Sequence, residues 1–214
     1  EQYVTVYSGM EIEPFLSPPM AREEVRRSLG LAPEHVAVGT IARLFHLKGH
    51  DDLLGAAPEL CGRLANLRFL WVGDGLLRPA FERRIREMGL QDRFILTGLV
   101  PPSRIPELTQ AMDILVHPSR REGLARAIPQ GQLAGCPVVV YDVDGNREGL
   151  IDGETGFLVP AFDARKLSAR LAVLSEEQSL RRRMGDAGRE FASRRFSARA
   201  MVDALEKVYA DALS

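Results

Sequence analysis

The sequence predicts an α/β fold: a Rossmann-like, doubly wound parallel sheet of about six strands, with helices on both faces and a helical C-terminal tail. Two observations support this prediction. Strand-like and helix-like segments alternate along the chain. The strand-like segments are also continuous apolar runs without alternating polarity, which is typical of parallel strands covered on both faces. The 214 residues are enough to bury a sizeable core.

The individual elements follow from this pattern. Strands are predicted at residues 36–42, 67–73, 93–98, 113–117, 137–141 and 156–159. Helices are predicted between them at residues 50–64, 76–88, 103–112 and 123–134. Beyond Asp163 the pattern is helical almost to the end of the chain, with a break near Phe196. The first seven residues also have a β-like composition.

Composition excludes several classes of protein. The net charge of -1 gives no reason to expect a nucleic-acid partner, and no apolar run reaches the roughly 18 residues of a transmembrane helix. Cys61 and Cys136 lie far apart in apolar contexts, which predicts buried free thiols. The chain has no initiator Met and opens in a β-like run, so we expect it to be part of something longer.

Candidate binding residues come from the loops that follow the strands, because ligands of open α/β sheets bind at the carboxyl ends of strands where the strand order reverses. After the first strand, Arg43 and Lys48 are suited to a diphosphate, although two solvated cations on a surface loop would give the same pattern. After the second strand, Gly73 and Gly75 allow backbone to pass close to a ligand, or form only a tight turn with Asp74 as a helix cap.

The loop after the fourth strand predicts a second anion site. Gly123 is expected to open a helix, whose first N–H groups are unpaired and lie at the positive end of the helix dipole. Glu122 at this helix start and Gln130, eight residues later, would be offset by about 80° and share a broad face that could hold sugar hydroxyls. Alternatively, Glu122 is only a capping charge. After the fifth strand, Glu148 is either a hydroxyl acceptor or a loop charge.

Taken in order, the motifs resemble the retaining glycosyltransferases of family 4, the group 1 glycosyltransferases, which have the two-domain GT-B fold. The resemblance implies that this chain is the C-terminal, donor-binding domain. Residues 1–20 would be the end of the acceptor domain and the interdomain linker, residues 21–195 the nucleotide-sugar-binding domain, and residues 196–214 a C-terminal helix. The matching segments are Gly39–Arg43 with Lys48–Gly49, Val72–Gly75, Phe94–Gly98, Ala111–Ser119, Glu122–Gly123, Leu133–Val139, Glu148, Asp152–Val159, and Arg189 with Phe196–Ser197.

The resemblance also implies roles for single residues. Arg43 and Lys48 would bind the donor diphosphate and stabilise the leaving nucleotide, and Glu122 would sit by the donor sugar. The backbone of Leu124 and Ala125 would contact the phosphates, and Gly123 would be a further substrate-binding position. The base would meet the backbone of Leu99 and Val100, and further substrate contacts would come from Gly73, Gly75, Gln130 and Glu148.

Two positions depart from the family pattern. Gln130 occupies the place of the second Glu of the E-x7-E motif, which normally binds the ribose hydroxyls; an uncharged side chain gives hydrogen bonds roughly half as strong. Asp144 stands where the family usually has Gly before Gly145. A carboxylate there would either repel a diphosphate or bind a hydroxyl, and the sequence does not decide between the two.

The resemblance therefore implies transfer of a glycosyl group, with retention, from a UDP, GDP or ADP sugar to an acceptor sugar or a lipid-linked acceptor held by the N-terminal domain. No cofactor and no metal are expected, because Arg43, Lys48 and the helix start would stabilise the leaving nucleotide, and no His/Cys cluster is present to hold a metal ion. Alone, the chain should bind the donor but transfer little. We expect a cytoplasmic location and leave a peripheral position at the inner membrane face open.

Two other readings remain. The chain would be a nucleotide-sugar binding module without turnover, for which Gln130 is the best support. A sugar-nucleotide epimerase of the same architecture would use His46 and His117 as cleft acids and bases.

Overall fold

The computed structural model describes residues 3–213 and contains a six-stranded sheet in the order β3-β2-β1-β4-β5-β6. All neighbouring strands pair in parallel. The strands are β1 (Val36–Ile41), β2 (Leu67–Val72), β3 (Phe94–Gly98), β4 (Ile114–His117), β5 (Val138–Asp142) and β6 (Gly156–Pro160). This confirms the predicted fold class and all six predicted strands, whose ends differ from the predicted ends by one residue at most.

The central strands are apolar throughout because both sides of the sheet are covered. Alternate side chains of each strand point to opposite faces. Val38, Trp71 and Val116 belong to the core on one face, whereas Leu70 and Leu115 belong to the core on the other. All five side chains are completely buried, which explains why these strands lack the alternating polarity of a half-exposed sheet.

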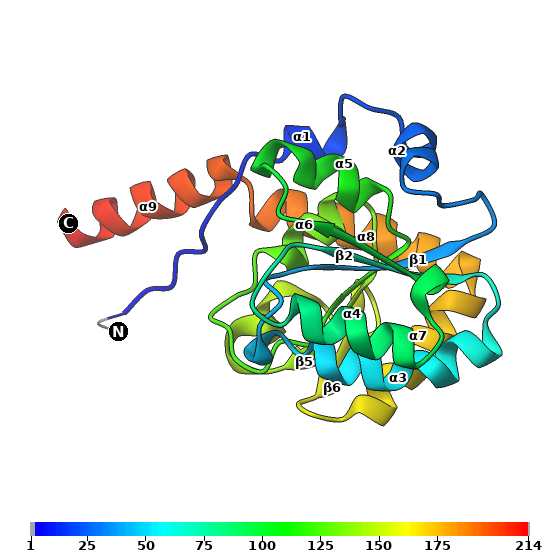
Figure 1. Ribbon diagram of the computed structural model, residues 1–214. Coiled ribbons are helices and arrows are strands. Elements are labelled where there is room, and N and C mark those ends of the chain that lie inside the picture. The colour runs from blue at the N-terminus through cyan, green and yellow to red at the C-terminus, as the bar shows by residue number, and fades with distance from the viewer. Residues whose placement is uncertain (1–2, 214) are drawn as a thin grey trace.

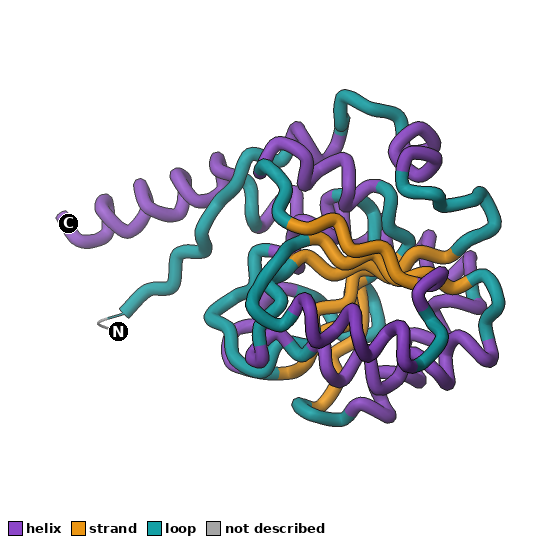
Figure 2. Tube along the Cα trace, in the orientation of Figure 1, coloured by secondary structure: helices purple, strands orange, loops and turns teal. Residues whose placement is uncertain are grey.

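Helices cover both faces, as Figures 1 and 2 show. One face carries α3 (His50–Arg63), α4 (Arg78–Glu87) and α7 (Ala164–Glu176), which contribute Leu53, Phe81 and Leu171 to the first core. The other carries α2 (Arg22–Ser28), α5 (Ile105–Gln110) and α6 (Ala127–Leu133). The long α8 (Gln178–Arg195) packs on α6, and the short α1 (Glu13–Leu16) packs on α5. Single 3-10 turns occur at η1 (His46–Lys48), η2 (Gln91–Arg93), η3 (Pro102–Arg104) and η4 (Asp144–Gly149).

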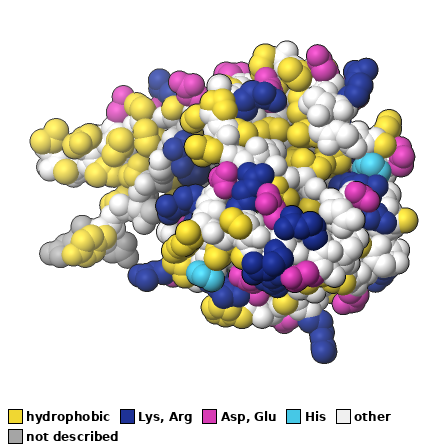
Figure 3. All heavy atoms as spheres, viewed as in Figure 1, with side chains coloured by type: hydrophobic (Ala, Val, Ile, Leu, Met, Phe, Trp, Pro, Cys, Tyr) yellow, Lys and Arg dark blue, Asp and Glu magenta, His cyan; other side chains and the backbone are white. Residues whose placement is uncertain are grey.

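The two ends of the chain leave the body on the same side (Figure 1). Residues 3–9 form no strand, so the expected β-like opening is wrong over the described residues. A strand needs a hydrogen-bonded neighbour, and the first one along the chain is the bridge between Met10 and Ser197. The last helix, α9 (Ala198–Leu213), has no buried residue. It runs away from the body and exposes apolar atoms along its length (Figure 3).

Within residues 3–213, none of the helices is long and apolar enough to cross a bilayer. Cys61 and Cys136 are both buried and free, as the sequence predicted.

Candidate functional site

The strand order reverses between β1 and β4, and the loops that follow these two strands are tied together. The hydroxyl of Ser119 donates to the carbonyl of Leu47 at 3.0 Å, and the amide of Arg120 donates to the same carbonyl at 2.8 Å. Gly49 has a positive φ of 70°, and a Cβ atom there would lie 1.9 Å from the carbonyl oxygen of Pro118. Only glycine fits this approach, which brings residues of the two loops into contact.

A cluster of three side chains, one buried and two half-buried, bridges the two loops. Lys48, from the loop after β1, forms an ion pair with Oε1 of Glu122, from the loop after β4. Nε2 of His117, at the end of β4, lies 2.9 Å from the same oxygen. Only 4% of the His117 side chain and 15% of the Glu122 side chain are exposed. This cluster stands at the switch point of the sheet, where the strand order predicts a ligand site.

The cluster keeps Glu122 ionised. Burial alone would raise the pKa of its carboxyl, but hydrogen bonds with His117, Lys48 and Ser119 outweigh burial and lower that pKa to about 2. An ionised carboxylate only accepts hydrogen bonds, so Nε2 of His117 is the donor. The Lys48 ammonium has three N–H groups, and Glu122 engages one of them, which leaves donors for a further anion.

Arg43 lies in the same loop as Lys48 but outside this cluster. Its side chain is exposed, and within residues 3–213 it makes no hydrogen bond or ion pair. The structure therefore brings Lys48 and Glu122 together and leaves the Arg43 guanidinium, five residues before Lys48, open to solvent.

The two glycines after β2 have their close contacts with protein backbone. A Cβ atom at Gly73, where φ is 134°, would lie 2.2 Å from the carbonyl oxygen of Ala42, and one at Gly75 would lie 2.5 Å from that of Leu44. The glycines let the loop after β2 pack on the loop after β1. Their predicted contact with a substrate stays a prediction. Beyond β3, Leu99 is 87% exposed, and Val100 is half-buried.

The prediction that Gly123 opens a helix is wrong. The helix α6 begins at Ala127, and residues 122–125 form a loop that precedes it. At the start of α6, the amide of Ile128 bonds to the carbonyl of Ala125, and Pro129 has no N–H. The predicted helix start therefore does not lie at Gly123, and anion binding by this region stays a prediction. Glu122 lies outside the helix, so the expected helical offset between Glu122 and Gln130 does not apply.

The η4 loop holds the loop of residues 122–125 from the other side. Oδ2 of Asp144 accepts from the amide of Glu122 at 2.9 Å, and Oδ1 of Asn146 accepts from the amide of Ala125 at 3.4 Å. Between them, a Cβ atom at Gly145 would lie 1.9 Å from the carbonyl oxygen of Gly123. The amide of Ala125, expected to contact a phosphate, is thus bonded within the protein.

Glu148 accepts a hydrogen bond, as predicted for a hydroxyl acceptor, but its partner is the Tyr7 hydroxyl. Arg195 in turn donates to the Tyr7 oxygen at 2.8 Å. The hydrogen bond to Glu148 raises the pKa of Tyr7. A cavity of about 300 Å³ lies between the N-terminal segment and the site loops. Three predicted site residues line it, Gly123, Leu124 and Glu148, together with Gly145.

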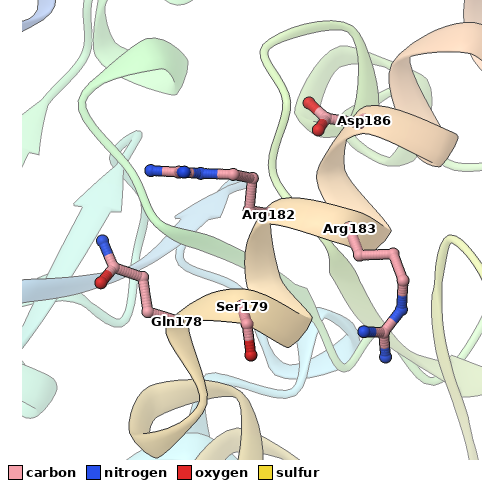
Figure 4. Close-up of a pocket in the computed structure, with 5 residues that line it drawn as sticks. All are labelled: Gln178, Ser179, Arg182, Arg183 and Asp186. Atoms are coloured by element: carbon pink, nitrogen blue, oxygen red, sulfur yellow. The ribbon is translucent and has the colours of Figure 1, made fainter.

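The other hollows lie away from these loops. The one in Figure 4, of about 520 Å³, is lined by Gln178, Ser179, Arg182, Arg183 and Asp186. Gln178 also lines a hollow with Asp113, the residue before β4, which places this region at the amino-terminal edge of the sheet. In Figure 4 the guanidinium groups of Arg182 and Arg183 point apart, so they do not converge on one anion.

Sequence reasoning missed part of this arrangement. His117 was noted only as an epimerase candidate, and neither its bond to Glu122 nor the role of Asn146 was foreseen. Among the described residues, no group of three or more His, Cys, Asp and Glu side chains is placed to hold a metal ion. The expectation of a metal-independent reaction stays a prediction.

Fold and site together define a Rossmann-like α/β domain with a charged cluster at its switch point. Residues 21–191 match the family model for glycosyl transferases group 1, and the chain belongs to this family. The chain is 31% identical over 188 residues to the alpha-D-kanosaminyltransferase of Streptomyces kanamyceticus, covering 88% of this chain and 48% of that protein. It is also 31% identical to the D-inositol 3-phosphate glycosyltransferase of Corynebacterium aurimucosum, covering 90% and 47%.

Solved structures show the same architecture. The crystal structure of Anabaena HepE in complex with UDP-glucose is 25% identical, with a TM-score of 0.86, and the match covers 96% of this chain and 57% of that one. The C-terminal domain of a glycosyl transferase group 1 family protein from Francisella tularensis is 19% identical, with a TM-score of 0.79. The match covers 89% of this chain and 100% of that one. The fold is that of a GT-B domain. The chain spans about half the length of the curated relatives it matches.

Proposed function

We propose that this chain is the donor-binding domain of a retaining glycosyltransferase and that it holds a nucleoside diphosphate sugar at the switch point of its sheet. The observation that carries the proposal is the Lys48–Glu122–His117 cluster, which places a cation and an ionised acceptor side by side. A diphosphate needs cationic donors, and a sugar needs hydroxyl acceptors. Membership of the group 1 family and the UDP-glucose complex of the similar Anabaena HepE support the same assignment.

In this proposal Lys48 and Arg43 bind the donor diphosphate. Lys48 retains N–H groups beyond the one that Glu122 engages, and the solvent-exposed Arg43 guanidinium has its full fork of donors available. When the bond between the anomeric carbon and the β-phosphate oxygen breaks, negative charge grows on that oxygen. Lys48, which Glu122 already holds in place, would stabilise the transition state because it needs little reorganisation, and Arg43 would add a second positive charge.

Glu122 would face the donor sugar, and Gln130 would contact the ribose. Glu148 would reach a substrate hydroxyl by exchanging the Tyr7 hydroxyl for it. The exposed Leu99 and its neighbour Val100 would contact the base. The donor would be of the UDP, GDP or ADP type, and the chemistry would need no metal or other cofactor. A second domain would hold an acceptor sugar or a lipid-linked acceptor, and without it this chain would transfer little or nothing. The reaction would take place in the cytoplasm or at the inner membrane face.

One alternative keeps the nucleotide site but not the reaction: a binding module in which Gln130 replaces the charged ribose contact. The two differ in one measurement. A longer protein that contains this domain releases UDP, GDP or ADP from its sugar donor in the presence of acceptor if it is a transferase, and binds the donor without release if it is a binding module.

Donor binding is tested by thermal unfolding of this chain with UDP, GDP and ADP at millimolar concentration. We expect at least one of them to raise the melting temperature, since a ligand at 100 times its dissociation constant adds roughly 2.7 kcal/mol to stability. Arg43→Ala and Lys48→Ala should abolish the ligand-induced shift. Arg182→Ala is the matched control, because Arg182 is also exposed but lies at the opposite edge of the sheet.

The comparison uses the shift caused by the ligand and not the melting temperature itself, because Lys48→Ala also removes an ion pair from the free protein. No shift with any of the three nucleotides would contradict the proposal. An equal loss of the shift in Arg182→Ala would show that the cations act by general charge alone.

A further inference from the structure

Two neighbouring side chains of the η4 loop hold the loop of residues 122–125 by its backbone. Asp144 accepts a hydrogen bond from the amide of Glu122, and Asn146 accepts one from the amide of Ala125. The two amides between them, at Gly123 and Leu124, make no hydrogen bond within residues 3–213. Gly123 is exposed, Leu124 is half-buried, and both line the cavity on the site side.

The geometry of η4 is specific to this contact. Asp144 has a φ of +43°, a conformation that Asp and Asn adopt more readily than other side chains. Gly145 has no room for a Cβ atom against the carbonyl oxygen of Gly123. Asn146 is completely buried and is fixed by a second bond, from its Nδ2 to the carbonyl of Tyr141 at 3.2 Å. The chain thus keeps an unusual backbone conformation where it meets the other loop.

We propose that Asp144 and Asn146 are positioning residues that preset the donor-phosphate loop, leaving the amides of Gly123 and Leu124 as the ones that bind the donor diphosphate. This inference rests on the proposed function. The amide of Glu122 donates to Oδ2 of Asp144, so this carboxylate has a partner within the protein, which neither a repelling nor a hydroxyl-binding role requires. Glu122 is consequently held at both ends: its backbone by Asp144, and its carboxylate by Lys48 and His117.

Two substitutions of Asp144 distinguish the effect of its hydrogen bond from the effect of its charge. Asp144→Asn removes the charge but keeps an oxygen acceptor and a residue type that tolerates positive φ. Asp144→Ala removes the charge and the acceptor together. If Asp144 acts by holding the loop, Asn rescues what Ala loses. If its charge acts on the ligand, the two variants behave alike.

Calorimetry on the folded chain measures this with the tightest binder among UDP, GDP and ADP, and with the matching nucleoside, which has no phosphate. We expect Asp144→Ala to weaken nucleoside diphosphate binding at least fivefold and Asp144→Asn to stay within twofold of wild type, with the nucleoside unaffected by both. A merely structural role would weaken both ligands together. Gly145→Ala, which pushes the loops apart without changing Asp144 or Asn146, should also weaken binding of the nucleoside diphosphate. Gly62→Ala is its control, because a Cβ atom there meets nothing within 4 Å.

The outcomes are distinct. Equal binding by wild type and Asp144→Ala, or equal changes in both Asp144 variants, overturns the positioning role and leaves donor binding in place. Absence of binding by wild type and every variant overturns the proposed function and this inference with it. If Asp144→Ala does not fold, Asp144→Asn and Gly145→Ala decide the question. Tighter binding of the nucleoside diphosphate by Asp144→Asn, or unchanged binding by Gly145→Ala, overturns the inference.

Discussion

Replacement of Glu122 by Gln should remove an acid-sensitive part of the folding free energy. Gln keeps the size of the side chain and an oxygen that His117 and Lys48 can approach, but it has no charge. The carboxyl of Glu122 has a folded-state pKa of about 2, below its ordinary value of 4.5. A carboxyl with a lowered pKa contributes stability above its unfolded pKa, and this contribution is lost as the pH falls towards the folded pKa. The sensitive window is therefore pH 4.5 down to pH 2.

The magnitude follows from the difference between the two pKa values. At about 1.4 kcal/mol for each pH unit, the full difference corresponds to roughly 3 kcal/mol at neutral pH. The side chains of Glu122 and Lys48 are 15% and 22% exposed, and solvent screening reduces the contribution of such a partly exposed pair. We therefore expect Glu122→Gln to be less stable than wild type by about 1–2 kcal/mol at pH 7, and more than half of this difference to vanish by about pH 3.

Urea unfolding followed by circular dichroism, from pH 7 to pH 3, measures the difference directly. Glu206→Gln on the exposed helix α9 is the control and should track wild type at every pH. A difference between wild type and Glu122→Gln that stays constant across the range would refute the reasoning, because a loss of packing alone does not depend on protonation of this carboxyl.

Two further predictions concern single side chains. His50 is 1% exposed, and its burial, with a smaller effect from the nearby His117, lowers its pKa to about 4. The free energy of unfolding should therefore fall by up to about 3 kcal/mol as the pH falls from 6.5 to 4. His50→Phe should remove this loss in melting curves at pH 7 and pH 4.5, and an unchanged pH dependence would contradict the assignment. Gln130→Glu should tighten nucleoside diphosphate binding about fivefold in calorimetry, since a charged acceptor adds roughly 1 kcal/mol to a ribose hydrogen bond. Weaker binding in this variant would mean that the Gln130 NH₂ group donates to the ligand.

The sheet could be predicted from the sequence because burial on both faces leaves a direct pattern in the residues. The strands Val36–Ile41 and Val138–Asp142 are largely apolar short runs rich in β-branched residues, which are typical of covered parallel strands between helices. The buried thiols of Cys61 and Cys136 were predictable for the same reason. A run of apolar residues indicates a buried segment without knowledge of its distant contacts.

The site was predictable in its location but not in its contacts. The loops that follow the strands could be named as candidates from the sequence, whereas the strand order, and with it the pairing of Lys48 with Glu122, appears only in the structure. The helix α6 begins at Ala127, later than predicted, because Pro129 has no N–H to donate to the carbonyl of Ala125 and fits only the first turn of a helix, a limit that the prediction overlooked. Residues 3–9 have a β-like composition, but no neighbouring strand accepts their hydrogen bonds.

The position of β1 between β2 and β4 has a consequence for the order of folding. The strands β1, β2 and β3 form from one continuous stretch of chain, but the pairing of Val38 with Ile114 joins segments far apart in sequence, and the loop-closure entropy of such pairings slows folding. Lys48 belongs to the first stretch, and His117 and Glu122 belong to the second. A partly folded chain therefore has no complete site, and a bound nucleotide would stabilise only molecules in which both halves of the sheet have joined.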